Sequence, residues 1–276
     1  MPVGGADLVH GLDVDLPLLT PGAATVSTVH DLSVFDTPWA FSRVRARGER
    51  LVLRQALRRA DALVAVSAFT AERVRDVLGR DATVTPLAPG PGFAPADQTE
   101  QARVRGAHRL PARFVLHVGT VEPRKDVPLL ASACREVGIP LVLAGAVAAG
   151  QSVPAGAQHL GYVAAGDLPA LYSAATVVAY PSRYEGFGLP PLEAMACGAA
   201  VVASRVGALP ETLAEAAVLV PPADPDALVR ALRDLLADDA ARVELAAAGI
   251  ARAAGFSWDA TARGTLVVYR SLGITC

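Results

Sequence analysis

Two carboxylates stand eight residues apart in the run YEGFGLPPLEAMACG, residues 184–198. Glu185 lies among glycines, and Glu193 follows two prolines in what the pattern predicts to be a helix. Glycines let backbone N–H groups approach a ligand closely, and a helix N-terminus favours an anion. Acids around an anion site fit a ligand with hydroxyl groups at both ends, as in a nucleotide sugar. The alternative is an ordinary loop and helix with solvated acids.

Three further polar residues follow predicted strands. Arg124 and Lys125 come after the apolar run 113–118, where cations could stabilise the charge of a departing diphosphate. Such a pair is usually a solvated surface, but its position after a strand favours a ligand role. His30 directly follows the run 24–29, and a lone histidine in this place is either structural or part of a site.

Short β-branched runs alternate with longer amphipathic runs along the whole chain. The predicted strands are 24–29, 62–66, 83–87, 113–118, 140–144, 176–180 and 199–203. The predicted helices are 47–60, 68–79, 126–137, 167–175, 189–197, 225–237, 238–254 and 258–271. This alternation predicts an α/β fold with doubly wound parallel sheets, in which ligands bind beyond the carboxyl ends of the strands. The helix at 225–237 has a clear start, with Asp224 as N-cap and Pro225 in the first turn.

A proline- and glycine-rich segment, PLAPGPGFAPA at 86–96, interrupts this rhythm and is typical of a linker. We therefore expect two domains, 1–93 and 94–276, with the C-terminal helix returning toward the first. The first domain is short for an open parallel sheet, so we expect it to be incomplete.

Composition limits the class of protein. Hydrophobic residues make up 52% of the 276 residues and the net charge is −2, which argues against disorder and against a nucleic-acid partner. The three cysteines, Cys134, Cys197 and Cys276, have no metal-ligand spacing and suit a reducing compartment. No run is long and apolar enough to span a membrane. We expect a cytoplasmic protein.

Two other motifs are near-misses. Asp13-Val14-Asp15 has the form of a metal-binding DxD, but its context does not fit, and we expect no metal. The run from Gly145 to Ser152 is close to a phosphate-binding loop, yet Gln151 stands where the lysine would be and Pro154 disfavours the helix.

Arginines recur on one predicted helix at Arg47, Arg50, Arg54 and Arg58, spaced as one stripe. The stripe could meet anionic lipid at the inner face of a membrane, or a phosphorylated acceptor. A solvated helix face is the plainer interpretation.

Several motifs together resemble one enzyme family. They are YPSRYEGFGLPPLEAMACGAAVVAS at 180–204, HVGTVEPRKD at 117–126, GYV at 161–163, DLPALYSAA at 167–175 and FSW at 256–258. Their order and spacing resemble retaining glycosyltransferases of family 4. The resemblance covers nearly all of 80–260, and 6–80 weakly.

The resemblance implies the GT-B fold, two Rossmann-like domains facing a cleft, with the N-terminal one shortened here. It implies that Glu193 holds the ribose hydroxyls, that Glu185 positions the sugar, and that His30 approaches from the other domain. The implied donor-binding set is Gly119, Arg124, Lys125, Tyr162, Val163, Phe187, Gly188, Leu189 and Glu193. Some relatives have an arginine where this chain has Thr120, so Arg124 could supply that phosphate contact.

The function so implied is transfer of mannose or another hexose from a GDP- or UDP-sugar, without a metal or other cofactor. The acceptor would be a glycan, a lipid-linked glycan or a small molecule. The alternative is a non-catalytic nucleotide-sugar-binding module or partner subunit.

Overall fold

The computed structural model describes residues 5–13, 16–17, 20 and 22–274. Asp15 and Cys276, which bear on the DxD and cysteine interpretations, lie outside the described residues. Contacts divide the chain into two compact units. The first unit comprises Met1–Leu87, Glu185–Phe187 and Ser257–Cys276, and the second comprises Ala88–Tyr184 and Gly188–Phe256.

The second unit contains a six-stranded, fully parallel sheet in the order β10-β9-β8-β5-β6-β7. Its strands are β5 (Val115–Val118), β6 (Leu141–Ala144), β7 (Gln158–His159), β8 (Val177–Tyr180), β9 (Val201–Ser204) and β10 (Val218–Val220). Every residue of β6, β8 and β9 is buried. Such continuous apolar strands require helices on both faces of the sheet.

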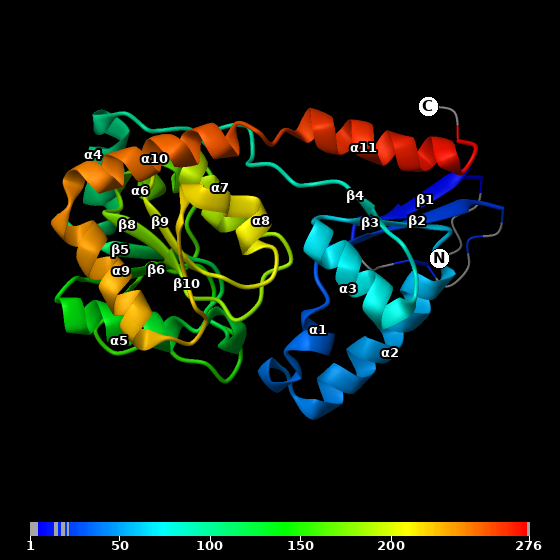
Figure 1. The fold of residues 1–276 in the computed structure, drawn as a ribbon, viewed down its shortest axis with the longest axis horizontal. Coiled ribbons are helices and arrows are strands. Elements are labelled where there is room, and N and C mark those ends of the chain that lie inside the picture. Colours follow the sequence, from blue (N-terminus) through cyan, green and yellow to red (C-terminus); the bar gives the residue numbers. More distant parts are fainter. Residues whose placement is uncertain (1–4, 14–15, 18–19, 21, 275–276) are drawn as a thin grey trace. The chain divides into compact units, whose positions relative to one another are not determined.

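Helices cover both faces of this sheet (Figure 1). They are α4 (Gln98–His108), α5 (Val127–Val137), α6 (Leu168–Ala174), α7 (Leu189–Ala196), α8 (Leu209–Leu213), α9 (Pro225–Ala237) and α10 (Asp239–Ala253). On one face α5 and α9 pack together, and their Leu130 and Leu232 share a core with Val115 of β5. On the other face α7 lies between the sheet and α10. Short 3-10 turns occur at η2 (Pro123–Lys125) and η3 (Ala214–Ala216).

The first unit contains a four-stranded parallel sheet in sequence order. Its elements are β1 (Leu8–Gly11), β2 (Ala24–Val29), α1 (Ser33–Asp36), η1 (Pro38–Ala40), α2 (Arg43–Arg59), β3 (Ala62–Ala65), α3 (Ala68–Leu78), β4 (Thr83–Val84) and α11 (Trp258–Ser271). Successive strand residues point to opposite faces. Leu63 therefore packs in one core with residues of α2 and α3, and Val64 packs with Val268 of α11 on the other face.

The α/β prediction with parallel sheets is confirmed, and so is the start of α9. Asp224 Oδ1 accepts a 2.9 Å hydrogen bond from the backbone N–H of Ala227, as an N-cap does. The strand expected over 83–87 is wrong in length, because β4 ends at Val84 and Pro86 has no N–H to donate. The structure adds the helices α1, α4 and α8 and the strands β1, β7 and β10, which the sequence patterns did not predict.

Candidate functional site

The strand order of the second unit changes direction between β5 and β8. The strands β6 and β7, which follow β5 in sequence, lie on one side of it in the sheet. The later strands β8, β9 and β10 lie on its other side. Ligands of open α/β sheets bind at this switch point, beyond the carboxyl ends of the strands. The loops after β5 and β8 meet here. The N–H of Arg183 donates to the carbonyl of Arg124 at 2.7 Å, and Arg124 Nη1 donates to the carbonyl of Tyr184 at 3.4 Å.

Glycines let the backbone segments at these strand ends approach one another. The N–H of Gly119 donates to Ala144 at 2.8 Å, and the N–H of Gly145 donates to Gly161 at 2.8 Å. A Cβ on Gly145, whose φ is +135°, would lie 2.3 Å from the carbonyl oxygen of Gly119. Gly145 is thus required at the end of β6, although the sequence interpretation placed it only in a rejected phosphate loop.

The predicted cations lie in η2, directly after β5. Lys125 is only 8% exposed, and the side chain of Arg124 is mostly shielded. Arg124 Nε forms a 2.9 Å ion pair with Glu122 Oε1. Charged groups are rarely withdrawn from water without a partner, and withdrawal strengthens their interaction with any nearby anion. The two cations are therefore built into the switch point and do not belong to a solvated surface.

The loop after β8 leads into α7 through Gly188. Its φ is +90°, and a Cβ there would lie 2.4 Å from Leu209 Cδ2, so no other residue fits without movement. Leu189 then begins α7, with proline in the first turn. The backbone N–H groups of this turn and the positive end of the helix dipole form a site suited to an anion.

Glu193 lies one turn into α7 and is half-buried. Burial raises the pKa of its carboxyl to about 7, and a hydrogen bond with Tyr172 acts in the opposite direction. Tyr172 is fully buried on α6, and its hydroxyl lies 3.4 Å from that of Tyr180. Sequence reasoning did not single out Tyr172. The signal that could have found it is a tyrosine in a mostly apolar helix. A buried tyrosine hydroxyl needs a polar partner, so it indicates a polar group nearby.

Tyr162 and Val163 follow Gly161 near the end of β6. Tyr162 is 87% exposed, whereas Val163 is buried at 6%. The hydrogen bond from the N–H of Gly145 to the carbonyl of Gly161 holds this segment at the carboxyl edge of the sheet, where donor-binding residues would have to lie.

Glu185, Gly186 and Phe187 belong to the first unit, although their neighbours in sequence belong to the second. The carbonyl of Gly186 accepts hydrogen bonds from Ser67 Oγ at 2.6 Å and from Thr70 Oγ1 at 2.9 Å. A Cβ on Gly186 would lie 2.0 Å from the carbonyl oxygen of His30. The structure thus brings the glycine between Glu185 and Phe187, both nearly buried, against the backbone of His30.

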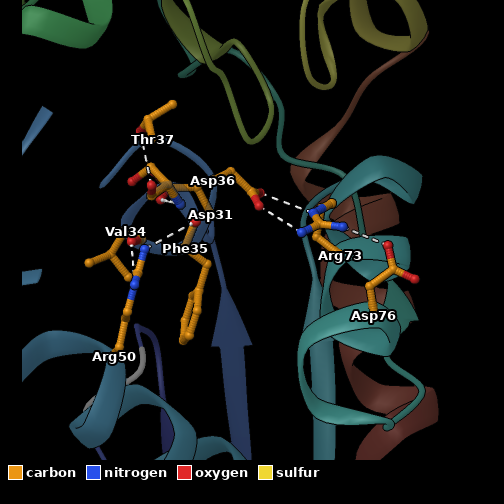
Figure 2. Close-up of polar contacts among 9 residues, drawn as sticks. Asp31, Val34, Phe35, Asp36, Thr37, Arg50, Arg73 and Asp76 are labelled. Atoms are coloured by element: carbon orange, nitrogen blue, oxygen red, sulfur yellow. Dashed lines mark hydrogen bonds and ion pairs between the residues drawn. The ribbon is translucent and has the colours of Figure 1, made fainter. Parts of the chain in front are cut away.

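His30 follows β2, as predicted, and its Nε2 forms a 2.8 Å hydrogen bond with the carbonyl of Leu12. Figure 2 shows the segment that follows it. Asp31 Oδ1 accepts from the N–H of Ser33 at 2.8 Å, and Thr37 donates to the carbonyl of Ser33 at 2.9 Å. At its end, Asp36 accepts hydrogen bonds from Nε and Nη2 of Arg73 in α3. These contacts fix the turn that carries His30.

The arginines predicted to form one stripe on α2 do not share one environment. Arg50 is half-buried, and its Nε donates to the carbonyl of Val34 at 2.8 Å (Figure 2). Arg54 lies with its guanidinium 5.3 Å from the ring centroid of Phe35 but stays exposed. Arg47 and Arg58 are exposed on the outer side of the helix.

Asp13 of the DxD run is among the described residues, and the other two residues of the run lie outside them. Among the described residues, no three His, Cys, Asp or Glu side chains gather in the way a metal ion requires. In the same part of the chain, no helix has both the length and the apolar character needed to cross a bilayer.

The fold, with its parallel α/β sheets, is that of the GT-B class of glycosyltransferases. The family model described as Glycosyl transferases group 1 matches residues 98–252, and that described as Glycosyltransferase Family 4 matches residues 4–90. The chain belongs to the group 1 glycosyl transferase family.

Individual proteins agree with this assignment. The O-antigen chain mannosyltransferase B of Escherichia coli is 34% identical over 96% of this chain and 74% of its own length. The structure of sucrose-phosphate synthase from Thermosynechococcus elongatus superposes with a TM-score of 0.76 at 30% identity, over 91% of this chain and 68% of that one. The Anabaena protein Alr3699/HepE, solved with UDP-glucose, has a TM-score of 0.75 at 20% identity, over 91% of this chain and 73% of that one.

Proposed function

We propose that this protein transfers a hexose from a nucleoside diphosphate sugar to an acceptor hydroxyl with retention of configuration. The observation that carries the proposal is the switch point between β5 and β8. There the shielded cations of η2, the N-terminus of α7 and the half-buried Glu193 occupy the loops and the first turns beyond two adjacent strands.

Each part has a role toward the donor. Arg124, Lys125 and the first turn of α7, with Gly188 and Leu189, hold the diphosphate. Glu193 accepts hydrogen bonds from the ribose hydroxyls. Gly119, Tyr162 and Val163 flank the nucleoside, where their positions at the sheet edge support this assignment.

The residues of the first unit act on the sugar. Glu185 and Phe187 position its hydroxyls, and His30 contributes from the end of β2. Support comes from the packing of Gly186 against His30 and from its hydrogen bonds with Ser67 and Thr70. These contacts fix the loop, and fixed orientation is a large part of the catalysis of bimolecular steps.

For the chemical step we propose attack from the front face. The bond between the anomeric carbon and the diphosphate oxygen breaks as the acceptor oxygen bonds to that carbon from the same side. The departing phosphate oxygen takes the acceptor's proton, and the products are a glycoside and a nucleoside diphosphate. Arg124, Lys125 and the α7 N-terminus stabilise the charge that develops on the leaving group. We propose that no metal is required.

Relatives suggest the donor and acceptor classes. The Escherichia coli protein is a mannosyltransferase of O-antigen chains by name, which favours a hexose such as mannose and a glycan or lipid-linked acceptor. The Anabaena structure contains UDP-glucose, which keeps UDP-sugars beside GDP-sugars as candidates. Cys134 and Cys197 are free and buried, which suits the reducing cytoplasm that we propose as the site of action.

The test combines donor screening with product analysis. The full chain is incubated with GDP-mannose or UDP-glucose and an alkyl mannoside acceptor, and nucleoside diphosphate release is measured. NMR of the product then gives its anomeric configuration, which should match that of the donor. An inverted product would contradict the retaining mechanism. Nucleotide binding without any acceptor-dependent release would favour the alternative, a non-catalytic binding module.

A further inference from the structure

Helix α2 concentrates positive charge on a chain that is acidic overall. The chain carries a net charge of −2, yet the 17 residues of α2 include seven arginines and a single acid, Glu49. Neighbouring like charges repel one another, so this clustering costs stability unless an anionic partner offsets it. Glu49 itself is paired with Arg45 at 2.5 Å.

The same helix exposes large apolar side chains. Val44 is 84% exposed, Leu51 61% and Val52 62%. Val44 and Leu51 are seven residues apart and therefore lie above one another on the outer side of the helix. Its inner side is different, since Ala46, Ala56 and Leu57 are buried there against the first unit. We call Val44, Leu51, Val52, Arg47 and Arg58 the outer α2 face.

The outer α2 face alternates apolar and cationic groups. Arg47 stands one turn before Leu51, and Arg58 stands two turns after it. Arginine side chains can extend their charged ends while their aliphatic stems lie along an apolar surface. Trp39, 58% exposed, lies in η1 just before the helix, and indole rings favour the boundary between water and lipid headgroups.

Arg50 lies on the inner side of α2 and differs from the arginines of the outer α2 face. Arg50 donates from Nε and Nη2 to the carbonyls of Val34 and Phe35 in α1, as Figure 2 shows, so it anchors the helix to its own unit. It is not available to a partner. The helix is thus anchored on its inner side, and among the described residues the side chains of Arg47 and Arg58 on the outer side form no ion pair.

We propose that the outer α2 face binds the surface of a membrane containing anionic lipids, with Val44 and Leu51 entering the headgroup boundary and Arg47 and Arg58 pairing with lipid phosphates. Apolar side chains between cations distinguish such a surface from a site for a soluble polyanion, which needs charge alone. This inference does not rest on the donor chemistry, and it can fail or succeed independently of sugar transfer.

Vesicle sedimentation of the full chain tests the proposal. Vesicles of phosphatidylcholine with 30 mol% phosphatidylglycerol are compared with phosphatidylcholine alone, and the chain should bind only the former. The double variant Arg47→Gln/Arg58→Gln should weaken binding by roughly 20- to 30-fold, which corresponds to about 1 kcal/mol per arginine. The matched control Arg233→Gln/Arg263→Gln removes the same charge from exposed positions on α9 and α11 and should leave binding unchanged.

A second double variant separates lipid from other anions. Val44→Ser/Leu51→Ser keeps the charge and should weaken vesicle binding roughly tenfold, while leaving retention on heparin unchanged. Trp39 fluorescence should shift to the blue on vesicle binding in a Trp258→Phe background. Absence of binding to the anionic vesicles, an equal loss in the control, or no effect of the serine variant would each overturn the proposal. The last result would indicate a soluble polyanion as the partner.

Discussion

The six-stranded sheet of the second unit and the four-stranded sheet of the first follow the same βα pattern but carry different groups at their carboxyl ends. In the second unit, Lys125 and Arg124 are shielded from water and Glu193 has a raised pKa. In the first unit, the turn after β2 is fixed by the hydrogen bond from the N–H of Ser33 to Asp31, and Ser67 and Thr70, which follow β3, donate to the carbonyl of Gly186. Under the proposed function, the second unit recognises the charge of the donor, and the first unit orients the sugar.

The two carboxylates of the run at 184–198 belong to different units. Glu185 belongs to the first unit and Glu193 to the second. Gly186 and Gly188 mark the transition, since each lies where a Cβ would collide with its own unit. If each acid has the role proposed above, nucleotide affinity and sugar transfer should be separable by mutation.

The largest effect is expected at the shielded cations. Lys125→Ala should lower the rate of donor turnover by roughly 10²- to 10³-fold, because preorganised groups that stabilise developing charge contribute this much. Nucleoside diphosphate release at saturating donor measures it. Arg233→Ala, an exposed cation on α9, is the control and should turn over as the unaltered protein does. Equal rates for both variants would remove Lys125 from the mechanism.

Glu193 should dominate binding of the nucleoside. Glu193→Ala is expected to weaken the affinity for the nucleoside diphosphate by roughly 10- to 100-fold, since hydrogen bonds to a charged group contribute about 1.5–3 kcal/mol. Calorimetry with UDP and GDP gives the affinity, and a circular dichroism melt confirms that the variant is folded. An unchanged affinity would show that the ribose does not bind this carboxylate.

Acid should weaken the same interaction. The pKa of Glu193, about 7, lies above its ordinary value of 4.5, and only the ionised carboxylate accepts hydrogen bonds from both ribose hydroxyls. Affinity should therefore be high above pH 7 and fall as pH drops through 7, by about tenfold between pH 8 and pH 6. Glu193→Gln should lose this component and keep only the titration of the nucleotide itself. An identical pH profile for both proteins would contradict the assignment.

Tyr172 should tune this profile as a positioning residue. Its hydrogen bond lowers the pKa of Glu193, so Tyr172→Phe should raise that pKa further and move the midpoint of binding to higher pH. At pH 7 the affinity should fall several-fold, by no more than about tenfold. Tyr180→Phe removes a neighbouring buried hydroxyl and is the control. A loss of affinity without a shift of the midpoint would indicate a structural effect only.

Much of the fold and part of the candidate site could be predicted from the sequence alone, because buried strands and capped helices have recognisable local sequence patterns. The parallel α/β fold, the start of α9 at Asp224 and the location of Arg124 after β5 follow from apolar runs and turn residues. Helix α4 was missed because Val104 is its only buried residue, so it has almost no apolar stripe. Gly145 and Tyr172 act through contacts with residues distant in sequence, and spacing carries no signal for these. Arg50 shows the same limit, since an evenly spaced arginine turned out to face inward.

The most direct test of the division of labour is calorimetry of UDP and GDP with the full chain, before and after Glu185→Ala. The account predicts that at least one nucleoside diphosphate binds the unaltered chain. It also predicts that Glu185→Ala changes that affinity by less than about twofold, because Glu185 positions the sugar and a nucleoside diphosphate has none. The same variant should lose sugar transfer. If neither nucleotide binds the folded protein, or if Glu185→Ala weakens binding as much as Glu193→Ala does, the account is wrong.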